Sequence, residues 1–198
     1  MHGSGLQEPL LGRRVFEEIR QERDGLLRFG LGGAEPCTLG EIAERYSVLL
    51  NVDNCFATPY LQRPAEQGAH LVTHSATKFI DGQGRVLGGA VLGSEELIER
   101  ATFLSRHTGP ALSPFNAWLL SKSLETLSVR MEAHCRNAEA VVGALTDHEA
   151  VARVYYPGLE DHPGHDVAAG QMDGFGGMIS FELTGGVEAA TEFVAATE

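Results

Sequence analysis

A chain of 198 residues, 43% hydrophobic and 21% charged, has the composition of a globular protein and could form one large domain or one and a half smaller ones. Its net charge of -12 argues against nucleic acid or an anionic membrane as a partner. It has no apolar run long enough to span a bilayer, and residues 1–11 lack the pattern of a signal peptide. Three widely spaced cysteines without a C-x-x-C pair make a disulfide framework unfavourable, so we expect a cytoplasmic protein.

The first part of the chain ends in a predicted helix and strand. Residues 1–36 show one partial helical stripe and stay an unassigned N-terminal segment. Thr38 and Glu41 fit a capping box, which predicts a short helix that begins after Thr38. The apolar run Val48–Val52 predicts a strand that is covered on both faces, as in a parallel sheet.

A βαβ unit follows this strand. Residues 60–67 have room for one crossover helix, closed by Gly68, and the apolar run from Ala69 to Thr73 predicts a second buried strand. This pattern leaves Asp53 and Lys78 beyond the carboxyl ends of two strands. Ligands of open α/β sheets bind at that edge.

The rest of the chain continues the α/β pattern, with a domain boundary expected near Asp147. One helix of the series is long enough to bridge two domains. The expected elements are a strand at 85–92, a helix from Ser94 to about Ser105, a long helix from Ser113 to about Leu145, a strand at 151–156, a Pro/Gly/His loop, a strand at 178–183 and a helix from about Val187.

Lys78 stands in the most informative stretch of the sequence. It is one of two lysines, the other being Lys122; Ser75 and Thr77 come just before it and a glycine-rich loop follows. An amine beside two hydroxyls at a strand end can hold a phosphate and attack a carbonyl of the same ligand. Partial desolvation would lower its pKa from about 10.4 and expose a neutral nucleophile. The alternative is a strand-end lysine that reaches into solvent.

Other motifs favour ordinary structural roles. Residues 82–87 lack the third glycine of a dinucleotide fingerprint. His162 and His165 are separated by Pro-Gly, which favours a solvated loop over a metal site, so no metal is expected. His70 and His74 would share one face of a strand, where core or edge histidines are the default.

Asp53 and Lys78 together suit a pyridinium ring that is anchored at both ends. Asp53 would keep a proton on the ring nitrogen, Lys78 would hold the aldehyde carbon, and Ser75 with Thr77 would hold the phosphate. The alternative for Asp53 is a structural one, in which its carboxylate caps the following turn.

The segments Val52–Pro64 and His74–Lys78 resemble the cystathionine synthase/lyase (Cys/Met metabolism) family of pyridoxal-phosphate enzymes. Three further segments, Ile80–Arg85, Thr108–Trp118 and Lys122–Leu127, resemble its O-succinylhomoserine sulfhydrylase branch. The resemblance implies pyridoxal 5'-phosphate as cofactor, an aldimine at Lys78, a ring-nitrogen contact from Asp53, and phosphate contacts from Ser75 and Thr77.

The resemblance also implies a fold. It is an aspartate-aminotransferase-like (fold type I) large domain with a mostly parallel sheet, followed by a smaller C-terminal α/β domain, in dimers that pair into tetramers. We therefore expect an unassigned segment 1–36, a partial cofactor-binding large domain 37–146 that ends in a long interdomain helix, and the start of the small domain at 147–198. Family members are about twice as long, and Asn51 and Phe79 depart from the residues usual in the family.

The implied reaction is γ-replacement, in which sulfide displaces succinate from O-succinylhomoserine, or another acyl group from its O-acylhomoserine, to give homocysteine for methionine biosynthesis. Lys78 would move protons at the α and β carbons while Asp53 keeps the ring electron-accepting. The partners implied are an amino-acid substrate, sulfide and further copies of the chain. The alternatives are a cystathionine γ-synthase or lyase, and an inactive relative that acts only as a fold fragment or assembly partner.

Overall fold

The computed structural model of the chain describes residues 39–197. The chain divides into two compact units, Met1–Val48 and Leu49–Glu198. In the first unit, α2 (Leu39–Tyr46) confirms the helix predicted after Thr38, with Glu41 in its first turn. The expectation for residues 1–36 and for Thr38 as the cap lies outside the described residues. None of the described helices is long and apolar enough to cross a membrane.

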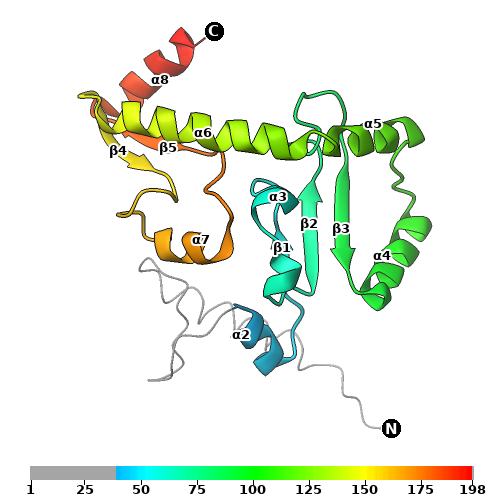
Figure 1. Cartoon of the computed structure of the whole chain (residues 1–198). Coiled ribbons are helices and arrows are strands. Elements are labelled where there is room, and N and C mark those ends of the chain that lie inside the picture. The colour runs from blue at the N-terminus through cyan, green and yellow to red at the C-terminus, as the bar shows by residue number, and fades with distance from the viewer. Residues whose placement is uncertain (1–38, 198) are drawn as a thin grey trace. The chain divides into compact units, whose positions relative to one another are not determined.

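The second unit begins with a three-stranded sheet in the order β1 (Asn51–Asp53), β2 (Leu71–Ser75), β3 (Gly89–Gly93). The first two strands are parallel, with Asp53 opposite Thr73, which confirms the βαβ unit. β3 runs antiparallel to β2, so the chain reverses direction in the loop that carries Lys78 (Figure 1).

β1 is less covered than its apolar run predicts. The ladder begins only at Asn51, and both Asn51 and Asp53 are exposed, so the expected burial on both faces is wrong. Because Asn51 is exposed, its amide avoids the cost of being buried without partners.

The crossover between β1 and β2 holds two short helices in place of the single helix predicted at 60–67. They are α3 (Thr58–Leu61) and the 3-10 helix η1 (Pro64–Gln67). Pro64 disfavours the helical backbone for Arg63, which has φ -123° and ψ 77°. Gly68 closes η1 in the left-handed conformation with φ 92°, as expected of a C-terminal cap.

The strand predicted at 85–92 begins only at Gly89. The backbone amide of Arg85 donates to the Asp81 carboxylate at 2.7 Å, which draws this part of the chain into a loop. The helix predicted from Ser94 is α4 (Glu95–Thr108), capped by Ser94 and ended by Gly109, three residues beyond the predicted end.

The long helix predicted from Ser113 to Leu145 is two helices, α5 (Pro114–Leu124) and α6 (Leu127–Thr146). Ser113 caps α5 through its side chain and Pro114 opens it, as predicted. At the break, two side-chain hydroxyls form hydrogen bonds with backbone carbonyl groups: Ser123 Oγ donates to Leu119 O, and Thr126 Oγ1 donates to Ser123 O. The expectation of one continuous helix is therefore wrong.

Helix α6 supplies side chains to two separate clusters of buried residues. Leu127 and Met131 pack with Leu61, while Ala138 and Val142 pack with Tyr156. A third cluster joins Ala76, Ile80 and Val86, which flank the Lys78 turn, to Leu120 of α5.

The last part of the chain forms a second, two-stranded sheet. β4 (Val151–Tyr155) pairs antiparallel with β5 (Ser180–Leu183), and α8 (Gly186–Ala196) follows. The loop predicted between the strands contains a helix, α7 (His165–Gln171). The two-sheet arrangement agrees with the fold expected from the sequence, and the domain boundary near Asp147 stays a prediction.

Candidate active site

The predicted site residues gather at one edge of the first sheet. Asp53 is the last residue of β1, and Ser75 is the last residue of β2. Because Asp53 lies opposite Thr73 in a parallel pair, and side chains alternate along a strand, Asp53, Thr73 and Ser75 share one face of the sheet. Lys78 follows three residues after β2, in a turn that spans residues 76–81.

Lys78 is exposed, and within the described part of the chain its ammonium group has no ion-pair partner. Its backbone is fixed: the Lys78 amide donates to Ser75 O at 3.2 Å, and the Gly82 amide donates to Lys78 O at 2.8 Å. By contrast, Lys122 is bound to Glu125 at 2.6 Å. Lys78 is thus the free amine of the two lysines, although the described residues do not supply the desolvation that the sequence analysis expected.

The two hydroxyls before Lys78 differ in their engagement. Thr77 Oγ1 donates to Gly88 O at 3.3 Å and accepts from the Gly88 amide at 3.1 Å. The Ser75 hydroxyl, which is half-buried, makes no hydrogen bond among residues 39–197. Ser75 is therefore free to bind a phosphate oxygen, whereas Thr77 would have to exchange its bond to Gly88 O.

Asp53 has the capping role that was its structural alternative. Its Oδ1 accepts a hydrogen bond from the Cys55 amide at 3.1 Å, while the Asp53 side chain stays exposed. Two effects raise the pKa of the Cys55 thiol: burial, which is the larger, and a hydrogen bond with Asp53. The thiol is therefore neutral. Capping and a ring-nitrogen contact are compatible, because a carboxylate has acceptor sites for several donors.

His74 is a buried residue of β2, and its Nδ1 has no hydrogen-bond partner among the described residues. Burial lowers the pKa of His74, and the nearby negative charge of Asp53 opposes this effect. The imidazole is therefore neutral at physiological pH.

A network of hydrogen bonds around Asp81 supports the Lys78 turn, and the sequence analysis did not predict it. Asp81 is fully buried, and its carboxylate accepts from the amides of Gln83 and Arg85 and from Arg85 Nε at 3.1 Å. Burial raises the pKa of Asp81, but the hydrogen bonds from Arg85 and Gln83 outweigh it, and the pKa lies below its usual value. Asp81 and Arg85 lie four residues apart, with Gly82 and Gly84 between them, and this spacing was the signal in the sequence that could have predicted the network.

Arg130 of α6 completes this network. Its guanidinium donates to the carbonyl oxygens of Phe79, Ile80 and Ser123, the last two at 3.0 Å. A Cβ at position 82 would overlap the Arg130 guanidinium, and φ there is +71°, so the close approach requires glycine. Phe79 and Ile80, the two residues after Lys78, are thereby hydrogen-bonded to a helix about 50 residues away in sequence.

The donor set fits a phosphorylated aldehyde with a basic ring nitrogen. Among the described residues it comprises an amine without an ion-pair partner, one hydroxyl without a hydrogen bond, one exchangeable hydroxyl, and the Asp53 carboxylate on the same sheet face as Ser75. In the described part of the chain, no group of three or more His, Cys, Asp or Glu side chains is arranged to hold a metal ion. His162 and His165 instead make hydrogen bonds with backbone groups of Gly164 and Pro157.

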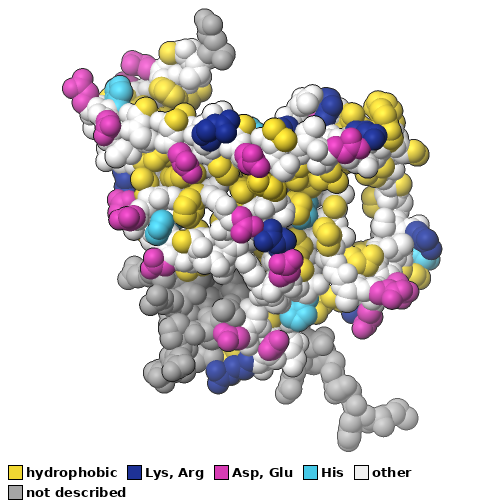
Figure 2. All heavy atoms as spheres, in the orientation of Figure 1, with side chains coloured by type: hydrophobic (Ala, Val, Ile, Leu, Met, Phe, Trp, Pro, Cys, Tyr) yellow, Lys and Arg dark blue, Asp and Glu magenta, His cyan; other side chains and the backbone are white. Residues whose placement is uncertain are grey.

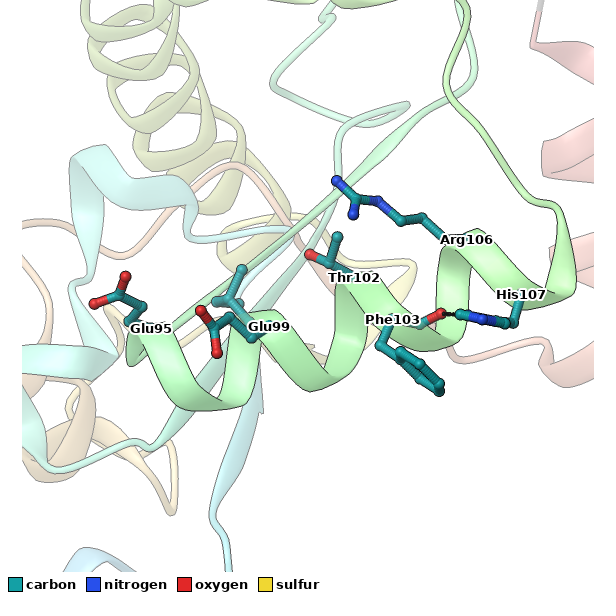
Figure 3. Close-up of a pocket in the computed structure, with 7 residues that line it drawn as sticks. Glu95, Glu99, Thr102, Phe103, Arg106 and His107 are labelled. Carbon is teal, nitrogen blue, oxygen red and sulfur yellow. Dashed lines mark hydrogen bonds between the residues drawn. The ribbon is translucent and has the colours of Figure 1, made fainter.

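A separate hollow lies along α4 and shares no residue with this edge. It is lined by Glu95, Ile98, Glu99, Thr102, Phe103, Arg106 and His107 (Figure 3).

Comparison with known proteins assigns the family. Residues 37–198 match the Cys/Met metabolism PLP-dependent enzyme family. The chain belongs to this family. Its members are pyridoxal-phosphate-dependent enzymes, so family membership assigns that cofactor to this chain.

Several enzymes of the family are similar to this chain. An O-succinylhomoserine sulfhydrylase of Pseudomonas aeruginosa is 51% identical over 159 residues, which are 80% of this chain and 40% of the relative. An L-methionine gamma-lyase of Fusobacterium nucleatum is 50% identical over 145 residues, 72% of this chain and 37% of the relative. A cystathionine gamma-synthase of Mycobacterium leprae is 45% identical over 166 residues, 83% of this chain and 43% of the relative.

A solved structure of the same family gives the fold. Cystathionine gamma synthase from Xanthomonas oryzae pv. oryzae, in complex with cystathionine, has a TM-score of 0.77 and 44% identity. The match covers 80% of this chain and 41% of that one. The aspartate-aminotransferase-like fold expected from the sequence is thereby confirmed for the part of the fold that the chain spans. The chain spans about two fifths of the length of these relatives.

Proposed function

We propose that this chain carries the cofactor-binding centre of a pyridoxal-phosphate-dependent γ-replacement enzyme. The substrate would be O-succinylhomoserine or another O-acylhomoserine, sulfide would replace the acyl group, and homocysteine would be the product for methionine biosynthesis. The observation that carries this proposal is the 51% identity with the O-succinylhomoserine sulfhydrylase of Pseudomonas aeruginosa. The cytoplasmic location expected from the cysteine pattern is part of the same proposal.

Lys78 has two roles in this proposal. Its Nζ, which has no ion-pair partner among the described side chains, is the covalent attachment point for the cofactor. When it is free, the Lys78 amine would remove one proton from the substrate Cα and one from Cβ, so that the acyl group can leave Cγ, and would return protons to these two carbons after sulfide has added at Cγ. The cofactor supplies the electron sink that makes these protons removable. The bonds from Arg130 to the carbonyls of Phe79 and Ile80 keep the turn that carries the amine in place.

The other site residues hold the cofactor in this proposal. Asp53 keeps a proton on the ring nitrogen, since a carboxylate stabilises a neighbouring positive charge. Ser75 donates a hydrogen bond from its hydroxyl to the phosphate. Thr77 does the same once its hydrogen bond to Gly88 O is broken. The remaining partners are the amino-acid substrate, sulfide and, as a homo-oligomer, further copies of the chain.

The 45% identity with a cystathionine gamma-synthase favours a second candidate function, in which cysteine is the nucleophile. The two candidates use the same cofactor residues and differ in the thiol that enters. Competition between sulfide and cysteine for one acylhomoserine, followed by the ratio of homocysteine to cystathionine, separates them. Homocysteine as the main product supports the sulfhydrylase, and cystathionine as the main product contradicts it.

The lysine assignment is tested by reductive trapping. The chain is incubated with pyridoxal phosphate, reduced with borohydride and mapped by peptide mass spectrometry. We expect the label on Lys78, because its amine is unpaired, and little on Lys122, whose ammonium binds Glu125. Lys78→Arg is the matched control and should abolish the label. A label that falls mainly on Lys122 would remove the basis for the proposed site.

A further inference from the structure

The turn that follows Asp53 leads to a residue in a strained backbone conformation. Thr58, the first residue of α3, has φ +62° and is fully buried. A β-branched residue rarely occupies the left-handed region, because its side chain crowds the backbone there. Such a conformation persists only where the surrounding contacts impose it, and strained residues of this kind cluster at functional sites.

Asn54 supplies the contacts that impose this conformation. Its side chain is buried, and Nδ2 donates to Thr58 O at 3.1 Å and to Gln62 O at 2.9 Å. Its backbone takes part as well. The Asn54 amide donates to Thr73 O at 2.9 Å, and Asn54 O accepts from the Thr58 amide at 3.0 Å. One residue therefore connects the end of β1 both to β2 and to the two ends of α3.

Helix α3 is anchored on its other side. Leu61 of α3 packs with Leu127 and Met131 of α6, and Leu61 O accepts from the Asp173 amide at 2.8 Å. Figure 2, in the orientation of Figure 1, shows hydrophobic side chains gathered where α6 runs above α3. Because α3 is held in this way, the bonds from Asn54 determine the path of the chain between Asp53 and α3.

This path sets the direction of the amide that binds Asp53. The Cys55 amide donates to Asp53 Oδ1 at 3.1 Å, and it belongs to the residue directly after Asn54. The Asp53 side chain is exposed, and an exposed carboxylate can adopt several rotamers unless a hydrogen bond restrains it. The orientation of the carboxylate therefore depends on a turn that Asn54 holds.

We propose that Asn54 is a positioning residue for Asp53. By fixing the turn 54–58, Asn54 holds the Cys55 amide in place, and this amide keeps the Asp53 carboxylate in one orientation for its contact with the ring nitrogen of the cofactor. The inference deepens the proposed function and rests on it, because the ring-nitrogen contact belongs to that proposal. In this role Asn54 acts through Asp53 and touches neither cofactor nor substrate.

The Cys55 thiol can report the place of the Asp53 carboxylate without any cofactor. Burial is the larger cause of its raised pKa, and the hydrogen bond with Asp53 and the negative charge of Asp53 raise it further. The alkylation rate of Cys55, followed by peptide mass spectrometry across alkaline pH, gives this pKa as a midpoint, because the thiolate is the reactive form. His74, whose pKa is lowered, stays neutral across this range.

The experiment compares the midpoints of the full chain and three variants. Asp53→Asn should lower the midpoint, because it removes the negative charge beside the thiol. Asn54→Ala should shift it in the same direction, because the carboxylate loses its fixed place. The double variant Asp53→Asn/Asn54→Ala should have the midpoint of Asp53→Asn alone, since Asn54 acts through Asp53. A further fall in the double variant would mean that Asn54 only keeps the thiol buried, and would overturn the proposal.

Asn116→Ala is the matched control, because it removes an asparagine bond to a backbone carbonyl, Leu87 O at 3.3 Å, outside this turn. It should leave the midpoint unchanged. Asn54→Ser, which keeps a shorter donor, replaces Asn54→Ala if circular dichroism shows that the alanine variant is unfolded, and should shift the midpoint in the same direction.

Two further results would overturn the proposal. One is an unchanged midpoint in a folded Asn54 variant. The other is an unchanged midpoint in Asp53→Asn, which would show that the carboxylate is not held beside the thiol. Because no cofactor is present, either failure is distinct from a failure to trap pyridoxal phosphate on Lys78.

Discussion

At the residue scale, the Lys78 turn owes its shape to polar groups that are not themselves reactive. Asp81 accepts two backbone amides and one arginine nitrogen while fully buried, and Arg130 binds carbonyl oxygens of the two residues after Lys78. Buried hydrogen-bonded charges fix geometry strongly, because removal of one partner leaves the others unsatisfied. The backbone of the Lys78 turn is therefore held by residues that follow Lys78 in sequence and by Arg130 of α6.

This arrangement gives a prediction for acidic pH. The pKa of Asp81 in the folded chain lies below its value of 3.8 in the unfolded chain. Its charge therefore stabilises the fold above about pH 4, and this contribution is lost as the pH falls through the folded pKa. Urea titrations between pH 7 and pH 2 should show the loss. Asp81→Asn should cost about 1–3 kcal/mol at pH 7 and flatten the dependence below pH 4.

Glu66→Gln is a suitable control for this experiment, because Glu66 is a carboxylate in an exposed pair with Arg63. Exposed pairs contribute about 0–1 kcal/mol, so the control should follow the wild-type curve closely. An unchanged acid dependence in Asp81→Asn would contradict the role given to the buried carboxylate.

The sequence predicts where the proposed reactive residues lie but does not predict the residues that support them, for a physical reason. Asp53 and Lys78 follow strand runs, and strand ends of a parallel pair meet at one edge, so their neighbourhood could be predicted from local pattern. Arg130 reaches the Lys78 turn across 50 residues of sequence, and only tertiary packing brings them together. No periodicity in either segment carries that information.

At the element scale, caps were predictable and breaks were not. Helices begin directly after Ser94 and Ser113, whose side chains cap them, and the helix η1 ends at Gly68, which adopts the left-handed conformation. The break between α5 and α6 was missed because the apolar spacing continues through it, from Leu120 to Leu127. What interrupts the helix is a set of side chain to backbone bonds near Ser123 and Thr126, which compete with helical bonds.

The caps provide a prediction of helix stability. Ser113 Oγ accepts from the Asn116 amide at 3.1 Å, whereas Ser94 Oγ accepts from the Leu97 amide at 3.5 Å. Ser113→Ala should therefore destabilise the chain by about 1 kcal/mol, within the range of N-cap losses, and Ser94→Ala by less. Thermal unfolding of both variants measures the difference. An equal or larger loss in Ser94→Ala would mean that the two bonds do not differ as their lengths suggest.

At the scale of the whole molecule, the proposed site residues lie at one edge of the first sheet. Lys78 and Asp53 are both exposed, so the described part of the chain leaves the reacting region open to water. Catalysis by a bound cofactor needs the reacting groups held in one geometry, and a misplacement of about 1 Å can cost on the order of a hundredfold. The relatives hold more than twice the length over which this chain matches them.

We therefore expect the 198-residue chain alone to bind pyridoxal phosphate weakly and to release little homocysteine. A coupled assay with O-succinylhomoserine and sulfide, run beside the trapping experiment on the same preparation, measures both properties. Trapping at Lys78 without turnover is the expected combination. Turnover typical of the family would show that residues 1–38 complete the site in a way that the described residues do not reveal.

The helix α6 has a consequence for how the second unit comes apart. Its first half packs with Leu61 and its second half with Tyr156, so one rigid rod belongs to two buried clusters. Because α6 belongs to both clusters, we expect the two sheets to unfold as one cooperative unit in spite of their separate ladders. Amide exchange along 127–146 should then be slow from end to end and should speed up together in Met131→Ala, although the nearest member of the Tyr156 cluster, Ala138, lies two turns away.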